Sequence, residues 1–278
     1  MKPVLRTPFC CRTLAAPRSL ALLALAGAAA LGGAQAQTLA PSVQAVAARA
    51  AEVSPVHARW QSTLDAFAQT DRAQHPADDG VLFVGSSTIR LWSSLSQDFR
   101  QVPVIINRGF GGSTMRDCNA LVRELVLQYK PRQVMVYAGD NDLAEGRAPE
   151  DVLASLQQFV RQVRAELPGT RISYISIKPS PERAALLPKV RQANALIAGY
   201  VQSVPAMRYI DIFTPMLDAQ GQPRAELFGA DRLHLNEAGY RLWQSVIAAD
   251  LSSAPALPPA PAQPPPQSPP QQVLAGHL

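Results

Sequence analysis

The sequence predicts a three-layer α/β fold in which a five-stranded, mostly parallel sheet lies between two layers of helices. From about residue 80 to residue 252, short apolar runs rich in β-branched residues alternate with longer segments of helical period. This alternation is typical of β-α units, and right-handed crossovers between parallel strands place helices on both faces of the sheet. A body of about 170 residues is also long enough to bury a real core.

Five apolar runs are the expected strands: Val81–Val84, Val102–Ile106, Gln133–Tyr137, Arg171–Ile177 and Arg208–Ile212. The expected helices are one that starts at Ser87, one that ends near Tyr129, Pro149–Leu167, Pro181–Ser203 and one that starts at Asn236. There is no internal repeat, so residues 80–252 are expected to form one domain.

Residues 1–36 have the features of a secretory signal peptide. Four basic residues precede an apolar run from Leu20 to Leu31, and Ala34-Gln35-Ala36 fits a small-residue cleavage site. The run is shorter than the about 20 apolar residues that a spanning helix needs. We therefore expect a mature chain that starts near Gln37, has no integral membrane segment and lies in the periplasm or outside the cell. A retained N-terminal anchor is the alternative.

Removing this segment changes the charge of the protein. The full chain has a net charge of +5, but residues 1–36 hold four of its 26 basic residues and none of its 21 acidic ones. The mature chain would keep 22 basic and 21 acidic residues, a net charge of +1. Its charge therefore does not indicate nucleic acid as a partner.

Two segments flank the domain. Residues 37–79 are rich in Ala and Gln, and the spacing of Trp60, Leu64 and Phe67 predicts an amphipathic helix that packs on the domain. Residues 253–278 form a tail in which nine of the sixteen residues from Pro255 to Pro270 are proline. Such a tail should be extended or disordered, and it either contacts a partner or the cell wall or is passive.

Several classes of site are excluded by the composition. Cys118 is the only cysteine after residue 36, so no intrachain disulfide is expected, and its side chain should be small, apolar and buried. The domain has one His and one Cys, too few ligands for a metal hydrolase. It has no G-x-G-x-x-G, P-loop or G-x-S-x-G motif. We therefore expect neither a metal nor a cofactor.

Polar and Gly-rich residues follow each predicted strand. Ligands of parallel α/β sheets bind at the carboxyl ends of the strands, where these residues would meet. They are Gly85–Ser87, Asn107–Ser113, Gly139–Asp142, Lys178–Ser180 and the loop that leads to Asp231 and His234.

His234 is the candidate general base. Of the other histidines, His57 and His75 lie in the N-terminal segment and His277 lies in the tail. Asp231 precedes His234 by three residues, a spacing that can place the carboxylate beside the ring, fix its tautomer and stabilise the imidazolium. Taken alone, this spacing is more typical of a helix-start Asp beside a surface His.

Ser87 is the candidate nucleophile. Gly85 permits a tight turn from strand to helix, and the unpaired N–H groups at the helix start favour the negative charge that develops on an attacked carbonyl. Gly111, Gly112 and Asn141 offer further donors for this charge. Each feature alone has a simpler explanation, since it could be an N-cap serine, a plain loop or a turn cap.

Four blocks in chain order resemble those of the SGNH, or GDSL, hydrolases: V-L-F-V-G-S-S-T-I-R (81–90), N-R-G-F-G-G-S (107–113), G-D-N-D (139–142) and D-R-L-H (231–234). The resemblance covers Val81 to Trp243 and implies the flavodoxin-like fold of this family. One departure is that the family's first block usually reads G-D-S, whereas this chain has Ser86 at the Asp position. The alignment favours Ser87 over Ser86 as the nucleophile.

Carried over by position, the resemblance implies that Ser87 is the nucleophile, His234 its base and Asp231 the residue that orients the base. It implies that Gly112 and Asn141 donate to the oxyanion together with the Ser87 N–H. Acyl transfer by these groups requires no cofactor.

The resemblance implies a serine ester hydrolase, and the predicted signal peptide implies that it is exported. We expect it to cleave short acyl groups, acetyl above all, from carbohydrates or similar alcohols. The alternatives are lysophospholipase or thioesterase activity on longer acyl chains, transfer of the acyl group to another alcohol, and a non-catalytic envelope-binding module. Phe110, Lys178 and Arg90 are candidates for shaping the pocket, although Arg90 would equally suit a solvated or ion-paired helix position.

Overall fold

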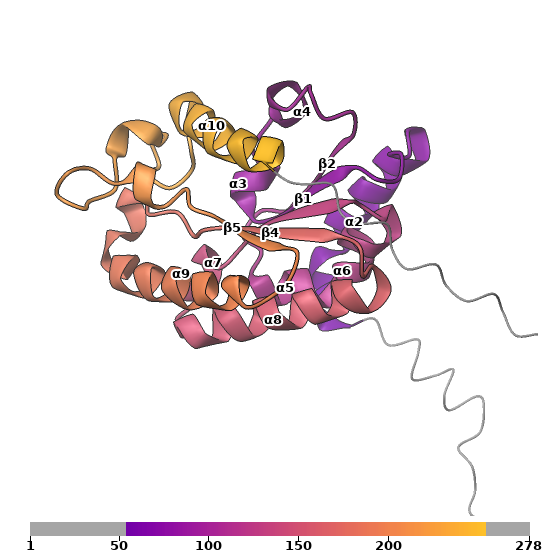
Figure 1. Ribbon diagram of the computed structural model, residues 1–278, viewed down its shortest axis with the longest axis horizontal. Helices are drawn as coiled ribbons and strands as arrows, with labels where there is room; N and C mark the ends of the chain where they lie inside the picture. The colour runs from indigo at the N-terminus through magenta and orange to yellow at the C-terminus, as the bar shows by residue number, and fades with distance from the viewer. Residues whose placement is uncertain (1–53, 254–278) are drawn as a thin grey trace, which may run out of the picture. The chain divides into compact units, whose positions relative to one another are not determined.

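The computed structural model of the protein describes residues 54–253, which form a sheet flanked by helices (Figure 1). The strands are β1 (Val81–Gly85), β2 (Ile105–Gly109), β3 (Gln133–Tyr137), β4 (Arg171–Ile175) and β5 (Met207–Ile210). They lie in the order β2-β1-β3-β4-β5, and every neighbouring pair is parallel. The predicted three-layer α/β fold is confirmed, with a sheet that is parallel throughout.

The side chains of the central strands alternate between two hydrophobic cores. In β1, Leu82 and Val84 belong to one core, and Val81 and Phe83 belong to the other. Every residue of β1 and β3 is buried, as expected for a parallel sheet that is covered on both faces. For this reason the strands appear in the sequence as continuous apolar runs rather than as alternating patterns.

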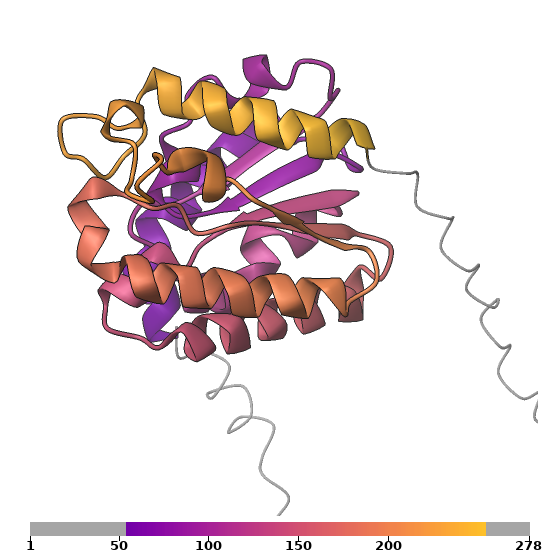
Figure 2. The same ribbon diagram turned by 60° about the vertical axis from the view of Figure 1, so that its left-hand side comes forward.

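Helices cover both faces of the sheet (Figures 1 and 2). One face carries α3 (Ser87–Arg90), α4 (Leu95–Asp98) and α10 (Glu237–Ser253). The other carries α2 (Pro55–Ala73), α5 (Met115–Ala120), α6 (Val122–Leu125), α7 (Asp140–Ala144), α8 (Pro149–Glu166) and α9 (Leu187–Gln202). The short 3-10 helices are η1 (Leu127–Tyr129), η2 (Pro181–Leu186), η3 (Thr214–Met216) and η4 (Ala225–Leu227).

The second strand lies three residues later than predicted. The apolar pattern indicated Val102–Ile106, whereas β2 spans Ile105–Gly109. Pro103 has no N–H to donate to a ladder, and Val102 is buried in a core without joining the sheet. At the other end, the strand includes Arg108, whose charge is paired with a carboxylate of α2. A pattern of apolar residues could not indicate a charged strand residue.

Some helix boundaries also differ from the prediction. The helix predicted over Pro181–Ser203 begins as η2, where Arg183 has non-helical backbone angles, and continues as α9. The helix expected to end near Tyr129 is divided into α5, α6 and η1, and the helix that starts at Ser87 ends after one turn. The remaining strands and α8 begin and end within two residues of their predicted bounds, and α10 begins one residue after its predicted start.

The predicted amphipathic segment contains α2. Trp60, Leu64 and Phe67 pack against the core, as their spacing predicts. Asp71 near the end of this helix forms a buried ion pair with Arg108, and the Tyr129 hydroxyl donates to Asp71 at 2.5 Å. Removing one partner of such a pair costs about 3–5 kcal/mol, so this contact holds α2 firmly on the sheet domain.

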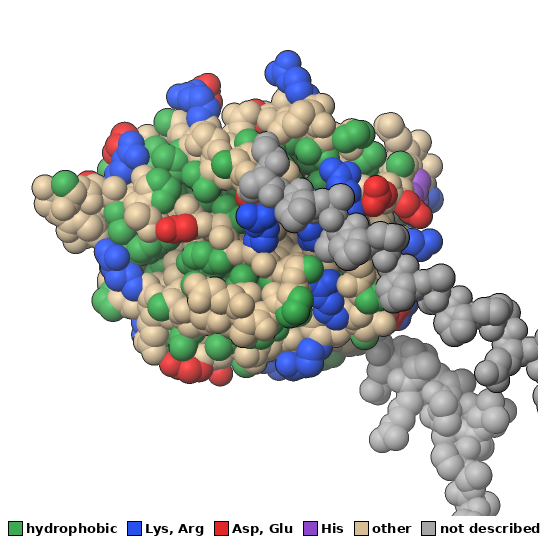
Figure 3. Space-filling view, viewed as in Figure 1, with side chains coloured by type: hydrophobic (Ala, Val, Ile, Leu, Met, Phe, Trp, Pro, Cys, Tyr) green, Lys and Arg blue, Asp and Glu red, His purple; other side chains and the backbone are tan. Residues whose placement is uncertain are grey.

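The predicted signal peptide, residues 37–53 and the proline-rich run from Pro255 onward lie outside the described residues. Between residues 54 and 253, no helix combines the length and the apolar character that a membrane crossing requires. The face in Figure 3 carries both basic and acidic side chains among apolar ones.

Candidate active site

Ser87 lies where the inner strand β1 passes into α3. Gly85 ends the strand with φ 141°, and a Cβ there would lie 1.7 Å from the carbonyl oxygen of Tyr137 on β3. Only glycine fits this position, because any side chain would collide with the neighbouring backbone. The Ser86 N–H donates to the same carbonyl at 3.0 Å, and Ser87 then begins the helix at the carboxyl edge of the sheet.

His234 is presented by a compact loop between η4 and α10. The Gly229 N–H donates to the His234 carbonyl at 2.8 Å, and Arg232 makes the turn with φ 57°. Asp231 Oδ1 accepts the backbone N–H groups of Leu233 and His234, each at 3.0 Å. One oxygen of this carboxylate thereby shapes the loop and leaves the other free for the ring.

A chain of hydrogen bonds joins Ser87, His234 and Asp231. His234 Nε2 lies 2.9 Å from Ser87 Oγ, and His234 Nδ1 lies 2.6 Å from Asp231 Oδ2. A carboxylate can only accept, so Nδ1 carries the proton and Nε2 turns its lone pair to the hydroxyl. The structure thus brings together three predicted residues, of which Ser87 and His234 are 147 positions apart.

The Asp231 carboxylate is stabilised in its ionised form. The hydrogen bond from the His234 ring is the main cause, and the N–H groups of His234 and Leu233 add to it, so the pKa of Asp231 is held well below its usual value. About half of the side chain is exposed, and hydrogen bonds rather than burial therefore set its charge. Such a carboxylate can stabilise an imidazolium at His234.

The loop after β2 lies beside the nucleophile. Its first residue, Phe110, donates its N–H to the Gly85 carbonyl at 2.8 Å, which ties the loop to the end of β1. Gly112 has φ 79°, a backbone conformation that favours glycine. No heavy atom lies within 4 Å of the position that a Cβ on Gly112 would take. A substrate can therefore approach the backbone closely at Gly112.

Asn141, in the first turn of α7, lies against this loop. Its Nδ2 donates to the Ser113 carbonyl at 2.9 Å, and its Oδ1 accepts from Arg183 Nη2 at 3.0 Å. The two predicted oxyanion donors, Gly112 and Asn141, therefore belong to one connected structure, although they follow different strands.

A buried cluster of charges lies next to Asn141. Asp140 Oδ2 is 2.9 Å from Lys178 Nζ and 3.4 Å from Arg183 Nη1. Burial would raise the pKa of Asp140, but the two cations more than offset this effect and lower it. Two positive groups share one negative group, so the cluster carries one surplus positive charge.

Two of the three predicted pocket residues, Lys178 and Phe110, have buried side chains. Lys178 is 3% exposed and donates to Asp140 and, at 3.1 Å, to the Tyr137 hydroxyl. Phe110 is 1% exposed and packs edge-on against Trp60 in the core. Their places after strands indicated the correct edge of the sheet, but not which way the side chains turn.

Arg90, the third pocket candidate, is exposed at the end of α3. Its guanidinium packs over the loop after β2, since a Cβ on Gly111 would lie 2.8 Å from Arg90 Nε. This places a cation beside Gly111 in the loop after β2.

The sequence analysis missed Arg183. The helical period of its segment indicates a surface position on a regular helix, whereas the structure places it in η2 and against Asn141. The only signal in the sequence was its place soon after the fourth strand.

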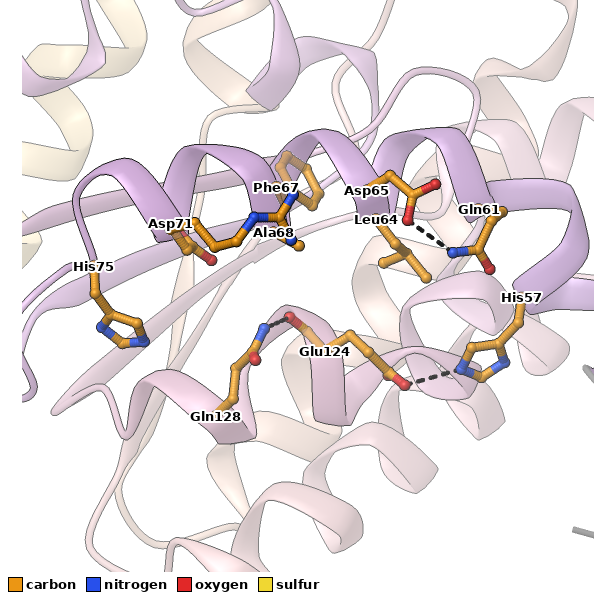
Figure 4. A pocket seen from close by; sticks show the side chains of 11 residues that line it. His57, Gln61, Leu64, Asp65, Phe67, Ala68, Asp71, His75, Glu124 and Gln128 are labelled. Atoms are coloured by element: carbon orange, nitrogen blue, oxygen red, sulfur yellow. Dashed lines mark hydrogen bonds and ion pairs between the residues drawn. The ribbon is translucent and has the colours of Figure 1, made fainter.

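Two other histidines do not share hydrogen bonds with the Ser87 group. His57 and His75 lie along a cavity of about 600 Å³ beside α2 (Figure 4). His57 Nε2 is 2.9 Å from Glu124 Oε1, and His75 Nδ1 is 2.8 Å from the Pro76 carbonyl. Across residues 54–253, no group of His, Cys, Asp and Glu side chains could hold a metal ion.

Comparison with known proteins decides the family. The model of the GDSL-like lipase/acylhydrolase family matches residues 77–242, more than half of the chain. The chain belongs to this family. It is therefore an acylhydrolase that acts on ester bonds, as the four sequence blocks imply. A comparison with the curated proteins found no match.

Solved structures share the fold of this acylhydrolase at low sequence identity. A protein from Streptococcus pneumonia, provisionally described as a platelet activating factor, is 21% identical with a TM-score of 0.62, and the match covers 69% of this chain and 93% of that one. A GDSL-like lipase from Bacteroides thetaiotaomicron is 20% identical with a TM-score of 0.57, covering 70% and 97%. A catalytic mutant of an acetylxylan esterase from Geobacillus stearothermophilus is 16% identical with a TM-score of 0.54, covering 63% and 95%.

One carboxylate of the acylhydrolase should make its stability depend on pH. Asp142 is fully buried, its Oδ2 accepts the Met115 N–H at 2.9 Å, and its Oδ1 has no partner in the described part of the chain. Burial is the main cause that raises the pKa of Asp142 to about 6. Between about pH 4 and pH 6 the folded protein therefore keeps a proton on Asp142 that the unfolded chain loses.

The free energy of unfolding should consequently fall as the pH rises through this range, by up to about 3 kcal/mol from this group. We expect Asp142→Asn to remove the part of this fall in the free energy of unfolding that is due to Asp142. Urea unfolding at pH 4 and pH 7 measures it. An equal difference between the variant and the wild type at both pH values would contradict the assignment to Asp142.

Proposed function

We propose that this acylhydrolase cleaves esters by attack of Ser87 Oγ, with His234 as the general base and Asp231 as the residue that orients it. The observation that carries the proposal is the hydrogen-bond chain from Ser87 Oγ through both ring nitrogens of His234 to Asp231. The tautomer that this chain requires leaves Nε2 able to take the Ser87 proton.

The reaction would proceed through an acyl-enzyme. As Oγ bonds to the ester carbonyl carbon, its proton moves to His234 Nε2, and the carbonyl oxygen becomes an oxyanion. The Ser87 and Gly112 N–H groups and the Asn141 amide would donate to this oxyanion. The alcohol would leave with the proton from His234. A water activated by the same nitrogen would then release the acid.

For the substrate, we propose short acyl esters, acetyl above all, on carbohydrates or similar alcohols. A long acyl chain needs apolar surface to cover it. Within the described part of the chain, Leu91 is the only large hydrophobic side chain that is exposed. Charged and polar groups lie at this edge of the sheet instead, including Arg90 beside the loop after β2 and the bonded pair of Arg183 and Asn141. The acetylxylan esterase with a similar fold is consistent with this proposal.

The test combines an ester panel with active-site labelling. We expect kcat/KM to be at least about tenfold higher for p-nitrophenyl acetate than for the octanoate, because the site offers little apolar surface to the longer chain. Acetate should also be released from acetylated xylooligosaccharides. A fluorophosphonate should label Ser87, with Ser87→Ala as the control for background labelling.

Other outcomes would favour the alternatives. A preference for the octanoate would favour lysophospholipase or thioesterase activity. Transfer of acetyl to an added sugar instead of water would favour an acyltransferase.

We also propose that the protein is exported, on the basis of residues 1–36. N-terminal sequencing of the protein from the periplasm or medium should then begin near Gln37, and an intact Met1 would contradict it.

A further inference from the structure

We infer that Arg183 is a positioning residue for the oxyanion site, which orients and polarises the Asn141 amide from the side opposite the substrate. The inference rests on the proposed function, since it takes Asn141 as an oxyanion donor. It assigns a role to a charged residue that belongs to none of the four family blocks.

The hydrogen bonds at Asn141 fix the direction in which its amide points. An amide donates only through Nδ2, and a guanidinium donates but never accepts. Arg183 Nη2 lies 3.0 Å from Oδ1, and the Ser113 carbonyl lies 2.9 Å from Nδ2. A flipped amide would lose both bonds and set like groups against each other. Both neighbours therefore hold the NH2 group toward the loop that carries Gly112.

The charge near Asn141 also favours this role for Arg183. Lys178 and Arg183 both face Asp140, and the side chains of Lys178 and Asp140 are only 1% and 6% exposed. Burial keeps this cluster away from the screening of water. Its surplus positive charge lies on the Oδ1 side of Asn141. A cation bonded to the amide oxygen withdraws electron density from the amide and strengthens Nδ2 as a donor. Negative charge that forms on a substrate oxygen should therefore be stabilised more than the neutral ester.

The local backbone places Arg183 at the site. The segment from Pro181 to Arg183 departs from regular helix, and the Arg183 N–H donates to the Ser180 carbonyl at 3.1 Å. The neighbouring Glu182 N–H donates to the Arg232 carbonyl at 3.1 Å, in the loop that carries Asp231 and His234. One short segment thus contacts both the oxyanion donor and the loop of the base.

Substitution of Arg183 tests the inference in the full-length chain. Losing a whole oxyanion donor reduces kcat by about 10²- to 10³-fold, so losing its orientation should cost less. For Arg183→Met we expect kcat for p-nitrophenyl acetate to fall about 10- to 100-fold, with KM changed by less than about threefold. Arg183→Lys keeps the charge but offers fewer donors, and should recover part of the loss. Arg191→Met is the matched control, because the Arg191 guanidinium donates to the backbone carbonyl of Gly221 rather than to Asn141.

Two further readouts separate positioning from a structural effect. A trifluoromethyl ketone forms an oxyanion on reaction with the serine, so its inhibition constant should rise by the same factor as kcat falls. In an Asn141→Ala background, Arg183→Met should change kcat by less than about threefold, because the amide through which it acts is gone. A full effect in that background, or wild-type kcat in Arg183→Met, would overturn the inference.

The test also distinguishes this inference from the proposed function. If wild-type protein neither cleaves the ester nor reacts with the fluorophosphonate at Ser87, the proposed function fails. If wild-type protein does both and the Arg183 variants match Arg191→Met, only the inference fails. Should Arg183→Met not fold, Arg183→Lys in the presence and absence of Asn141→Ala gives the same comparison.

Discussion

Ser87→Ala is expected to reduce kcat/KM for p-nitrophenyl acetate by about 10⁴- to 10⁶-fold, while the protein keeps its fold. Loss of the attacking hydroxyl removes the covalent step, and the remaining donors supply only a weak residual rate. Ser87 is partly exposed, and the hydrogen bond of its hydroxyl is to the His234 ring, so its removal should change the melting temperature little. Steady-state kinetics and thermal unfolding measure the two effects.

The neighbouring serine provides the matched control. Ser86 is fully buried, and its Oγ has no hydrogen-bond partner in the described part of the chain. Ser86→Ala removes an unsatisfied buried hydroxyl, so stability should be kept or slightly increased. Activity should stay within about threefold of the wild type, since only Ser87 reaches His234. If Ser86→Ala abolished activity and Ser87→Ala did not, the assignment of the nucleophile would be reversed.

The fold could be predicted from the sequence because the sheet is buried on both faces. Strands such as Val81–Gly85 then consist almost wholly of apolar residues, and nothing but their length and their neighbours is needed to recognise them. The prediction was wrong for β2, where the pattern of apolar residues and the ladder disagree. Pro103 moves the start of the strand, and the buried pair of Arg108 with Asp71 extends its end.

Patterns in the sequence are limited in the same way at the site, because they indicate backbone position but not the contacts of single side chains. The arrangement of Ser87, Asp231 and His234 could be predicted because it depends on backbone position, at a strand end and in a short loop. The burial of the Lys178 and Phe110 side chains could not be predicted. A side chain at a strand end can turn to solvent or to the core, and contacts with residues far away in the sequence decide which. For Lys178 the deciding contact is Asp140, 38 residues earlier. Arg183 was missed for a similar reason, since its partner Asn141 lies 42 residues away.

The second large effect is expected for Asp231→Asn, which should lower kcat by about 10³- to 10⁴-fold with little change in KM. The side chain of asparagine can still accept the backbone N–H groups of Leu233 and His234 through its oxygen. The other end of the amide would then present an NH2 group to His234 Nδ1 in place of Asp231 Oδ2. This donor favours the tautomer with the proton on Nε2, which cannot take a proton from Ser87.

Asp211→Asn is the matched control for the loss of a carboxylate. Asp211 is exposed and accepts a backbone N–H, that of Thr214, at 3.0 Å. It is not bonded to a histidine ring in the described structure, so we expect activity within about twofold of the wild type. NMR of the ring nitrogens of His234 should show the proton on Nδ1 in the wild type and on Nε2 in Asp231→Asn. A variant with wild-type kcat would mean that the loop, rather than the carboxylate, sets the tautomer of the base.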